Sequence, residues 1–109
     1  MIKWIGLIKR KPGITEQAFS KYWKDIHAAV VLKNMPGVVR YIQNHRIKIN
    51  EYDSAWDGIV ELWFEDLESF RSMSRWYLSE AGKILRDDED KFIDRSKTID
   101  MICEEAVIK

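Results

Sequence analysis

Runs of apolar residues mark four segments of the chain as β-strands. Each run is rich in β-branched and aromatic residues and is bounded by Gly, Pro or clustered polar residues. The predicted strands are Ile2–Ile8, Val38–Ile49, Ile59–Phe64 and Thr98–Ile108. Residues 50–56 are polar and Asp57-Gly58 is typical of a tight turn, so we expect the second and third strands to form a hairpin.

Apolar residues three and four positions apart predict a first helix between the first two strands. Thr15 suits its N-cap, and the helix is expected to end near Lys33. The residues of its apolar stripe are Phe19, Trp23, either Ile26 or His27, and Val30. This stripe should face the sheet.

A second helix is predicted after Asp66, which can cap it. Its stripe consists of Leu67, Phe70, either Met73 or Ser74, and Tyr77. A shorter helical piece is expected from Ser79 to about Arg86. The four acidic residues at 87–90 are interpreted as a solvated turn, because four consecutive side chains cannot converge on one cation without special backbone geometry.

The order strand, helix, strand, strand, helix, strand predicts the α+β ferredoxin-like fold. In this fold a four-stranded antiparallel sheet carries two main helices on one face, here within one domain of residues 1–109. Strand residues of both parities are apolar, so the other face also needs a cover. A second copy of the sheet would supply it, which predicts a homodimer.

Composition bears on partners and compartment. Eighteen basic and eighteen acidic side chains give a formal net charge of +0, which argues against nucleic acid as a partner. The longest stretch without a charged residue, Ile26 to Leu32, is far shorter than the roughly 20 residues of a membrane span, so neither a span nor a signal peptide is expected. A single cysteine, Cys103, excludes an internal disulfide and fits a reducing compartment, so a cytoplasmic location is expected.

The two histidines are the natural candidates for chemistry near neutral pH. His27 lies four residues after Trp23, on or beside the apolar stripe, and is either a buried neutral histidine or a site residue. Tyr41 and His45 share one face of the second strand, so all three side chains could line one cavity. Alternatively, His45 lies beyond the last helix contact and is exposed. No spacing suggests a metal site.

Two further features suggest a binding pocket. Glu61 lies in mid-strand, where an unpaired carboxylate is costly. It either pairs with a basic side chain such as Arg40 or Arg46, or has a raised pKa and orients a histidine. Five tryptophans exceed what a small core needs, and three of them are candidate pocket walls: Trp23, Trp63 and Trp76.

Several motifs together resemble the EthD family. They are KRKPGITEQAFSKYWKDIH with its Phe-x-x-Tyr-Trp-x-x-x-His run, MPGVVRYIQNH with its Asn44-His45 pair, and DGIVELWFEDLESF. The likeness spans nearly the whole chain. It implies a dimeric α/β barrel of two ferredoxin-like protomers, each with a small cavity between sheet and helices. One departure is Ala29, where a proline is expected shortly after the histidine.

The resemblance also implies a chemistry. Relatives act in the degradation of ethers and aromatics and in polyketide tailoring, as dehydratases, cyclases, isomerases or cofactor-free oxygenases. By this resemblance His27 and Tyr41 would transfer protons. We further expect Tyr41 and His45 to orient or polarise an oxygen atom of the substrate. We expect no metal or cofactor, and a small apolar molecule, aromatic or ketonic, as substrate. Its predicted contacts are Trp23, Asn44, Glu61, Trp63 and Trp76. The alternatives are an accessory protein that binds a hydrophobic metabolite or redox partner, and a haem-binding monooxygenase.

Overall fold

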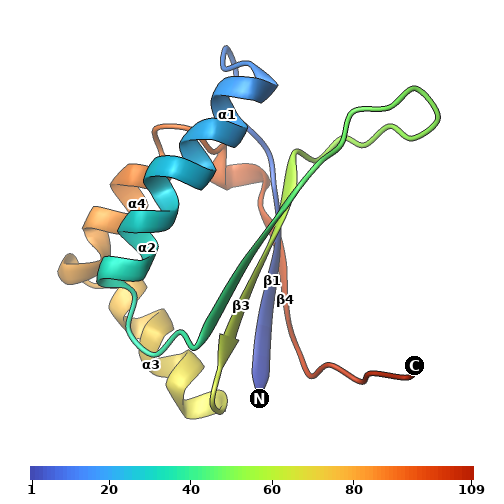
Figure 1. The fold of residues 1–109 in the computed structure, drawn as a ribbon. Helices are drawn as coiled ribbons and strands as arrows, with labels where there is room; N and C mark the ends of the chain where they lie inside the picture. Colours follow the sequence, from blue (N-terminus) through green and yellow to red (C-terminus); the bar gives the residue numbers. More distant parts are fainter.

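The computed structural model describes residues 1–109, and its elements follow the predicted order (Figure 1). The strands are β1 (Ile2–Ile8), β2 (Arg40–His45), β3 (Gly58–Phe64) and β4 (Ile99–Cys103). The helices are α1 (Glu16–Tyr22), a π-helical turn η1 (Trp23–His27), α2 (Ala28–Asn34), α3 (Leu67–Leu78) and α4 (Lys83–Glu89). Two 3₁₀ turns, η2 (Glu80–Gly82) and η3 (Arg95–Lys97), complete the chain.

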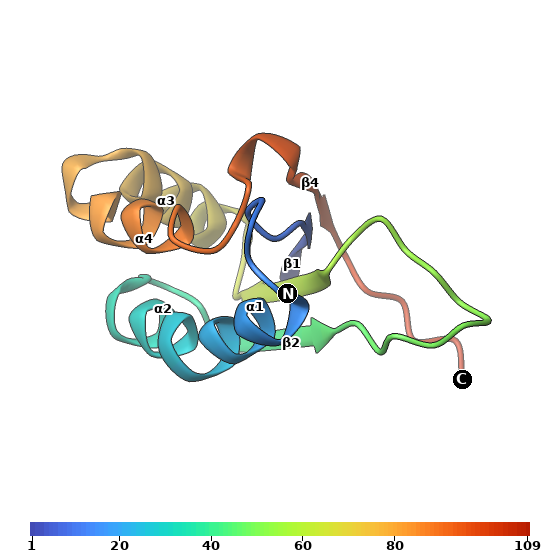
Figure 2. The same ribbon diagram turned by 90° about the horizontal axis from the view of Figure 1, so that it is seen from above.

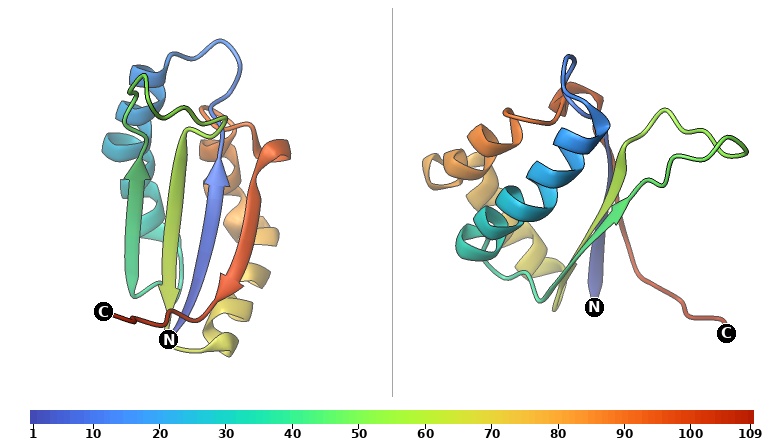
Figure 3. Two further views of the ribbon diagram at one scale, coloured as in Figure 1. Left: turned by 90° about the vertical axis from the view of Figure 1, so that its right-hand side faces the viewer. Right: turned by 45° about the horizontal axis from the view of Figure 1, so that its top comes forward.

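The four strands form one antiparallel sheet in the order β2-β3-β1-β4. All helices lie on one face of the sheet, in two rows that Figure 2 shows from above. The left view of Figure 3 looks onto the opposite face, where the strands lie in front and no helix covers them. This arrangement confirms the ferredoxin-like α+β prediction. The face that carries the helices is called the covered face below, and the opposite face the outer face.

Strand parity divides the side chains between the two faces. Val60, Leu62 and Phe64 of β3 are buried on the covered face, where they join the core with Phe19 and Trp23. The residues between them therefore point to the outer face. No helix combines the length and the apolar composition that crossing a bilayer requires.

α1, η1 and α2 form one continuous helix, capped by the Thr15 side chain, which accepts a hydrogen bond from the Ala18 N–H. Its buried residues are Phe19, Trp23, His27 and Val31, a spacing of four throughout. In a regular α-helix each step of four residues turns about 40° beyond a full circle. The wider π turn offsets part of this drift. It brings His27 rather than Ile26 inward, and Val31 rather than the predicted Val30 becomes the buried residue.

The predicted hairpin turn was wrong in position. β2 ends at His45, and residues 46–57 form a long connection that extends away from the sheet (Figure 1). Gly58 is not a turn residue but the first residue of β3. A Cβ there would lie 2.5 Å from the Trp23 ring, so the glycine allows the indole to pack against the strand. β4 is also shorter than predicted, and the tail after Cys103 leaves the sheet.

The interpretation of residues 87–90 as a solvated turn was wrong. α4 continues to Glu89, and Asp88 is only 6% exposed. Three residues follow Leu85 at helical spacing, namely Asp88, Glu89 and Phe92, which lie three, four and seven positions after it. This spacing places all four on one side of the segment. Two of the four acidic side chains, Asp88 and Glu89, therefore point toward the interior of the protein.

Candidate functional site

A cavity of about 390 Å³ lies between the helices and the covered face of the sheet. Thirteen of its 19 lining residues are hydrophobic, so its walls suit an apolar molecule of modest size. Its polar groups are few and come from different elements. They include His27 from η1, Tyr41 from β2, Tyr77 from α3 and Glu89 from α4.

His27 is held by a buried carboxylate. Its Nδ1 lies 2.7 Å from Asp88 Oδ2, and the Tyr22 hydroxyl donates to Asp88 Oδ1 at 2.6 Å. Burial lowers the pKa of His27 below its usual value, although Asp88 opposes this shift. A neutral imidazole whose Nδ1–H donates to Asp88 carries its lone pair on Nε2. Nε2 makes no hydrogen bond to the protein, and His27 lines the cavity. The ring can therefore accept a proton from a bound molecule.

Tyr41 supplies a second polar group to the cavity. Its hydroxyl oxygen accepts a hydrogen bond of 2.7 Å from Gln43 Nε2, which also donates to the Trp23 carbonyl at 2.8 Å. Burial raises the pKa of Tyr41, so the phenol keeps its proton at neutral pH. Its O–H can then donate to an oxygen atom of a ligand.

His45 is placed differently. Its ring packs 4.5 Å from the Trp23 ring, and its two nitrogens contact the Ser20 hydroxyl and, at 2.8 Å, Gln43 Oε1. Burial lowers the pKa of His45. The residue does not line the cavity, and neither ring nitrogen is free. In this geometry His45 supports Gln43 and the Trp23 ring.

Three predicted substrate contacts lie on the outer face, away from the cavity. Glu61 bonds with Lys3 Nζ at 2.9 Å and accepts from Asn44 Nδ2 at 2.9 Å. Its partner is thus Lys3 rather than Arg40 or Arg46, and its pKa is lowered, first by the Asn44 hydrogen bond and then by Lys3. Trp63 lies beneath Lys3, whose ammonium is 4.6 Å from the ring centroid.

The tryptophans divide in the same way. Trp23 lines the cavity, and Trp4 from β1, which the sequence interpretation omitted, does so as well. The Trp4 indole donates to Asp100 of β4 at 2.8 Å, which fixes its orientation. Trp76 is half-buried on α3 but does not line the cavity.

Glu89 is a further site residue that sequence reasoning missed, as it missed Asp88 and Trp4. It lines the cavity and accepts a hydrogen bond from the Tyr77 hydroxyl. Burial raises the pKa of Glu89 to about 7, an unusual value for a carboxyl group. The signal in the sequence was the helical spacing from Leu85 to Phe92, which the neighbouring Asp87 and Asp90 concealed.

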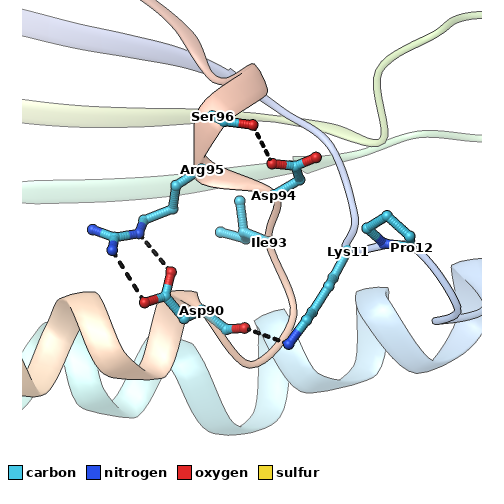
Figure 4. A pocket seen from close by; sticks show the side chains of 7 residues that line it. All are labelled: Lys11, Pro12, Asp90, Ile93, Asp94, Arg95 and Ser96. Carbon is cyan, nitrogen blue, oxygen red and sulfur yellow. Dashed lines mark hydrogen bonds and ion pairs between the residues drawn. The ribbon is translucent and has the colours of Figure 1, made fainter.

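A second hollow lies on the surface beside η3 (Figure 4). It is open, and only one of its seven lining residues is hydrophobic. Arg95 forms two hydrogen bonds to Asp90, Lys11 donates to the Asp90 carbonyl, and the Ser96 hydroxyl donates to Asp94. Because its charged groups already bind one another, it offers little to a ligand. No cluster of His, Cys, Asp and Glu suits a metal ion.

Comparisons with known proteins agree with this architecture. The structure is similar to an EthD family protein from Bacillus halodurans C-125, with 24% identity, a TM-score of 0.71, and coverage of 97% of this chain and 99% of that one. It is also similar to an EthD-like protein from Ralstonia eutropha JMP134, with 15% identity, a TM-score of 0.69, and coverage of 99% and 95%.

A third similar structure is a dimeric protein of unknown function with a ferredoxin-like fold from Bacteroides fragilis NCTC 9343. It shows 10% identity, a TM-score of 0.65, and coverage of 95% of both chains. No curated protein matches the chain. The EthD domain family model matches residues 11–96. This range contains every element from α1 to α4, and with them His27, Asp88 and Glu89. The chain therefore belongs to the EthD family.

Proposed function

We propose that this protein is an enzyme in which His27 transfers a proton to or from a small apolar molecule, aromatic or ketonic. One observation carries the proposal: a buried Asp88–His27 pair leaves Nε2 free in a predominantly apolar cavity of about 390 Å³. Asp88 sets the tautomer and orientation of the ring, and the lowered pKa of His27 favours the neutral form, which is the form that can accept a proton. Tyr41 can donate to an oxygen of the same ligand.

The reaction class follows from what these groups can supply. A positioned imidazole contributes about 10² to 10⁴ in rate, which suits enolisation, isomerisation, cyclisation or dehydration of an activated substrate. The apolar walls exclude water and strengthen the hydrogen bond from Tyr41. Proton transfer by side chains is the common requirement of these reactions. Cofactor-free oxygenation would begin with the same step, because it also needs a carbanion or an enolate.

We also infer that the protein acts as a homodimer joined through the outer face. Apolar side chains on this face remain exposed, among them Ile59 at 39%, Ile99 at 56% and Met101 at 61%. The Trp63 indole nitrogen is buried on the same face without a hydrogen-bond partner, and an acceptor on a second copy would satisfy it. A patch of this kind favours association. The relative from Bacteroides fragilis is itself described as dimeric.

The two histidines provide the test. A panel of cyclic ketones, phenols and β-hydroxyketones is incubated with the protein in D₂O, and NMR follows both product formation and deuterium uptake. His27→Asn should reduce the rate by about 100-fold or more, because an amide cannot accept a proton near pH 7. His45→Asn should lower stability and leave the rate constant almost unchanged, because His45 lies outside the cavity.

Other outcomes lead elsewhere. Full activity in a folded His27→Asn protein would contradict the proposal, and an equal loss in His45→Asn would return that residue to the catalytic set. Tight binding of panel compounds without turnover would favour the accessory role. A Soret band in the purified protein would favour the haem-binding alternative.

A further inference from the structure

Glu89 is a half-buried carboxyl group that lines the cavity and forms no ion pair. The Tyr77 hydroxyl donates to its Oε1, while Oε2 makes no hydrogen bond to the protein. The nearest cation, Arg95, directs two of its nitrogens at Asp90, at 2.6 and 3.1 Å, and reaches only the Tyr77 hydroxyl, at 3.4 Å. Glu89 therefore has one oxygen that is free to exchange a proton with a ligand.

The charged and titratable groups around Glu89 explain its protonation. Burial is the largest influence on its pKa, and the charges of Asp88 and Asp90 on its own segment raise it further. The hydrogen bond from Tyr77 of α3 and the charge of Arg95 of η3 oppose this shift. The result is a pKa of about 7, so the carboxyl keeps its proton in mildly acidic to neutral solution. Tyr41 of β2 and His27 of η1 line the same cavity, and burial raises the pKa of Tyr41 and lowers that of His27, which favours the uncharged form of both groups.

Asp88 and Glu89 are neighbours in sequence but differ in their hydrogen bonding. Asp88 is engaged by both His27 and Tyr22, so it serves to orient other groups. Glu89 has a single donor. Because the cavity has the volume of one small molecule, a ligand that fills it contacts both His27 and Glu89.

We propose that Glu89 is a second catalytic residue, which delivers a proton to the carbonyl oxygen of an uncharged ligand while His27 removes a proton from the adjacent carbon. This inference rests on the proposed function and names its substrate class, an uncharged enolisable carbonyl compound. The cavity offers no unpaired cation to an anionic ligand. The negative charge of the buried Asp88 carboxylate also disfavours an anionic ligand.

The step is balanced within the site. The C–H bond breaks and its proton moves to His27 Nε2, while its electron pair forms the carbon–carbon double bond of the enol. The carbonyl π electrons bind the proton from Glu89 Oε2. A neutral imidazole and a neutral carboxyl become an imidazolium and a carboxylate, so the net charge of the cavity does not change. Return of the two protons, to the original carbon or to another, gives exchange or isomerisation without any oxidant.

The test uses 2-tetralone, an uncharged aromatic ketone, as the probe. Its binding is measured by tryptophan fluorescence, since Trp4 and Trp23 line the cavity. NMR in D₂O measures loss of its α-protons above the protein-free rate. Glu89→Gln should reduce the catalysed exchange by about tenfold or more and change the dissociation constant by less than about threefold, because the amide keeps a hydrogen-bond donor but cannot release its proton. Glu80→Gln, the same change at an exposed carboxyl on η2, should have no effect.

The pH profile gives a readout that a merely structural role would not move. Wild-type exchange should fall as the pH rises through about 7, because Glu89 loses its proton there, and Glu89→Gln should lack this limb. Tyr77→Phe keeps the carboxyl but removes the hydrogen bond that lowers its pKa. In that variant the falling limb should move to higher pH. Tyr77→Phe therefore still tests the role of Glu89 if Glu89→Gln folds poorly.

The outcomes separate the two proposals. If Glu89→Gln keeps the wild-type rate and limb while His27→Asn is inactive, the role of Glu89 is overturned and the proposed function stands. If Glu89→Gln loses exchange but His27→Asn retains it, the role of His27 fails and that of Glu89 stands. A wild-type protein that does not bind tetralone, or binds it without exchanging its protons, overturns the inference about Glu89 and its substrate class.

Discussion

The two faces of the sheet handle polar groups in opposite ways. On the outer face Lys3 is buried, but it bonds to both Glu61 and Glu105 at 2.9 Å, and Asn44 completes the group. On the covered face His27 Nε2 and Glu89 Oε2 have no protein partner, and both residues line the cavity. A buried polar group that stays unpaired is costly. The outer face therefore pairs Lys3 with Glu61 and leaves only the Trp63 indole nitrogen buried without a partner, whereas His27 and Glu89 keep polar atoms available to a ligand in the cavity.

The carboxyl groups show the contrast most clearly. Asn44 and Lys3 lower the pKa of Glu61, so it is a stable anion, whereas burial raises the pKa of Glu89 to about 7. A paired carboxylate contributes to structure. A carboxyl that titrates near neutral pH inside a cavity can exchange protons, so the difference between the two glutamates indicates which face carries the chemistry.

The largest expected effect concerns the residue that shapes the covered face. Trp23 is 1% exposed and packs against Phe19, His45 and Gly58. Trp23→Ala should lower the free energy of unfolding by about 3 to 5 kcal/mol, as expected for the loss of a large core aromatic. Urea denaturation measures the loss. Trp76→Ala, at a half-buried position outside the core cluster, is the control and should cost clearly less. Equal losses would contradict the central place of Trp23 in the core.

The fold was predictable because it depends on periodicity. Strand parity, the Thr15 and Asp66 caps and the alternation of helix and strand are all visible in the chain, and each was observed in the structure. The end of β2 was not predictable, because apolar residues continue to Ile49 although pairing stops at His45. Gly58 was read as a turn because its actual constraint is the distant Trp23 ring, which only the tertiary structure brings near.

The site was less predictable than the fold. His27 and Tyr41 were found from helix and strand spacing, but local sequence does not signal the π turn that directs His27 inward. Glu61 was assigned to the pocket because the parity of its strand leaves open which face the helices cover. Glu89 was missed because its charge pattern is that of a solvent-exposed turn. Burial alone makes it different, and burial is a property of the folded chain.

The next effect sharpens the comparison between the two glutamates. Glu89 has an ordinary pKa of 4.5 when unfolded and about 7 when folded, so the folded state holds its proton more tightly. Its contribution to stability is complete below pH 4.5 and is lost as the pH rises to about 7. Relative to Glu89→Gln, the wild-type protein should lose roughly 2 to 3 kcal/mol over that interval.

Urea denaturation of both proteins across this pH range measures the effect. Glu61→Gln is the control, and its difference from the wild-type protein should have the opposite sign of pH dependence. Because the folded pKa of Glu61 is lowered, its contribution is present above pH 4.5 and is lost as the pH falls below that value. The same pH dependence for both variants would mean that the two faces do not treat their carboxyl groups differently.

The smallest effect on the protomer concerns the outer face. Ile59 is 39% exposed and lies opposite Leu7 of β1 and Asn44 of β2. Ile59→Glu should change the folding of the protomer little, within about 0.5 kcal/mol for an exposed position, yet a carboxylate there would be buried without a partner in a face-to-face dimer. Light scattering after size exclusion should then give 13.0 kDa instead of twice that mass.

Ile26→Glu makes the same change at a 49% exposed position on the helical side and should leave the dimer intact. Dissociation by Ile26→Glu alone would place the assembly surface on the helices, and a wild-type monomer at micromolar concentration would remove the dimer altogether.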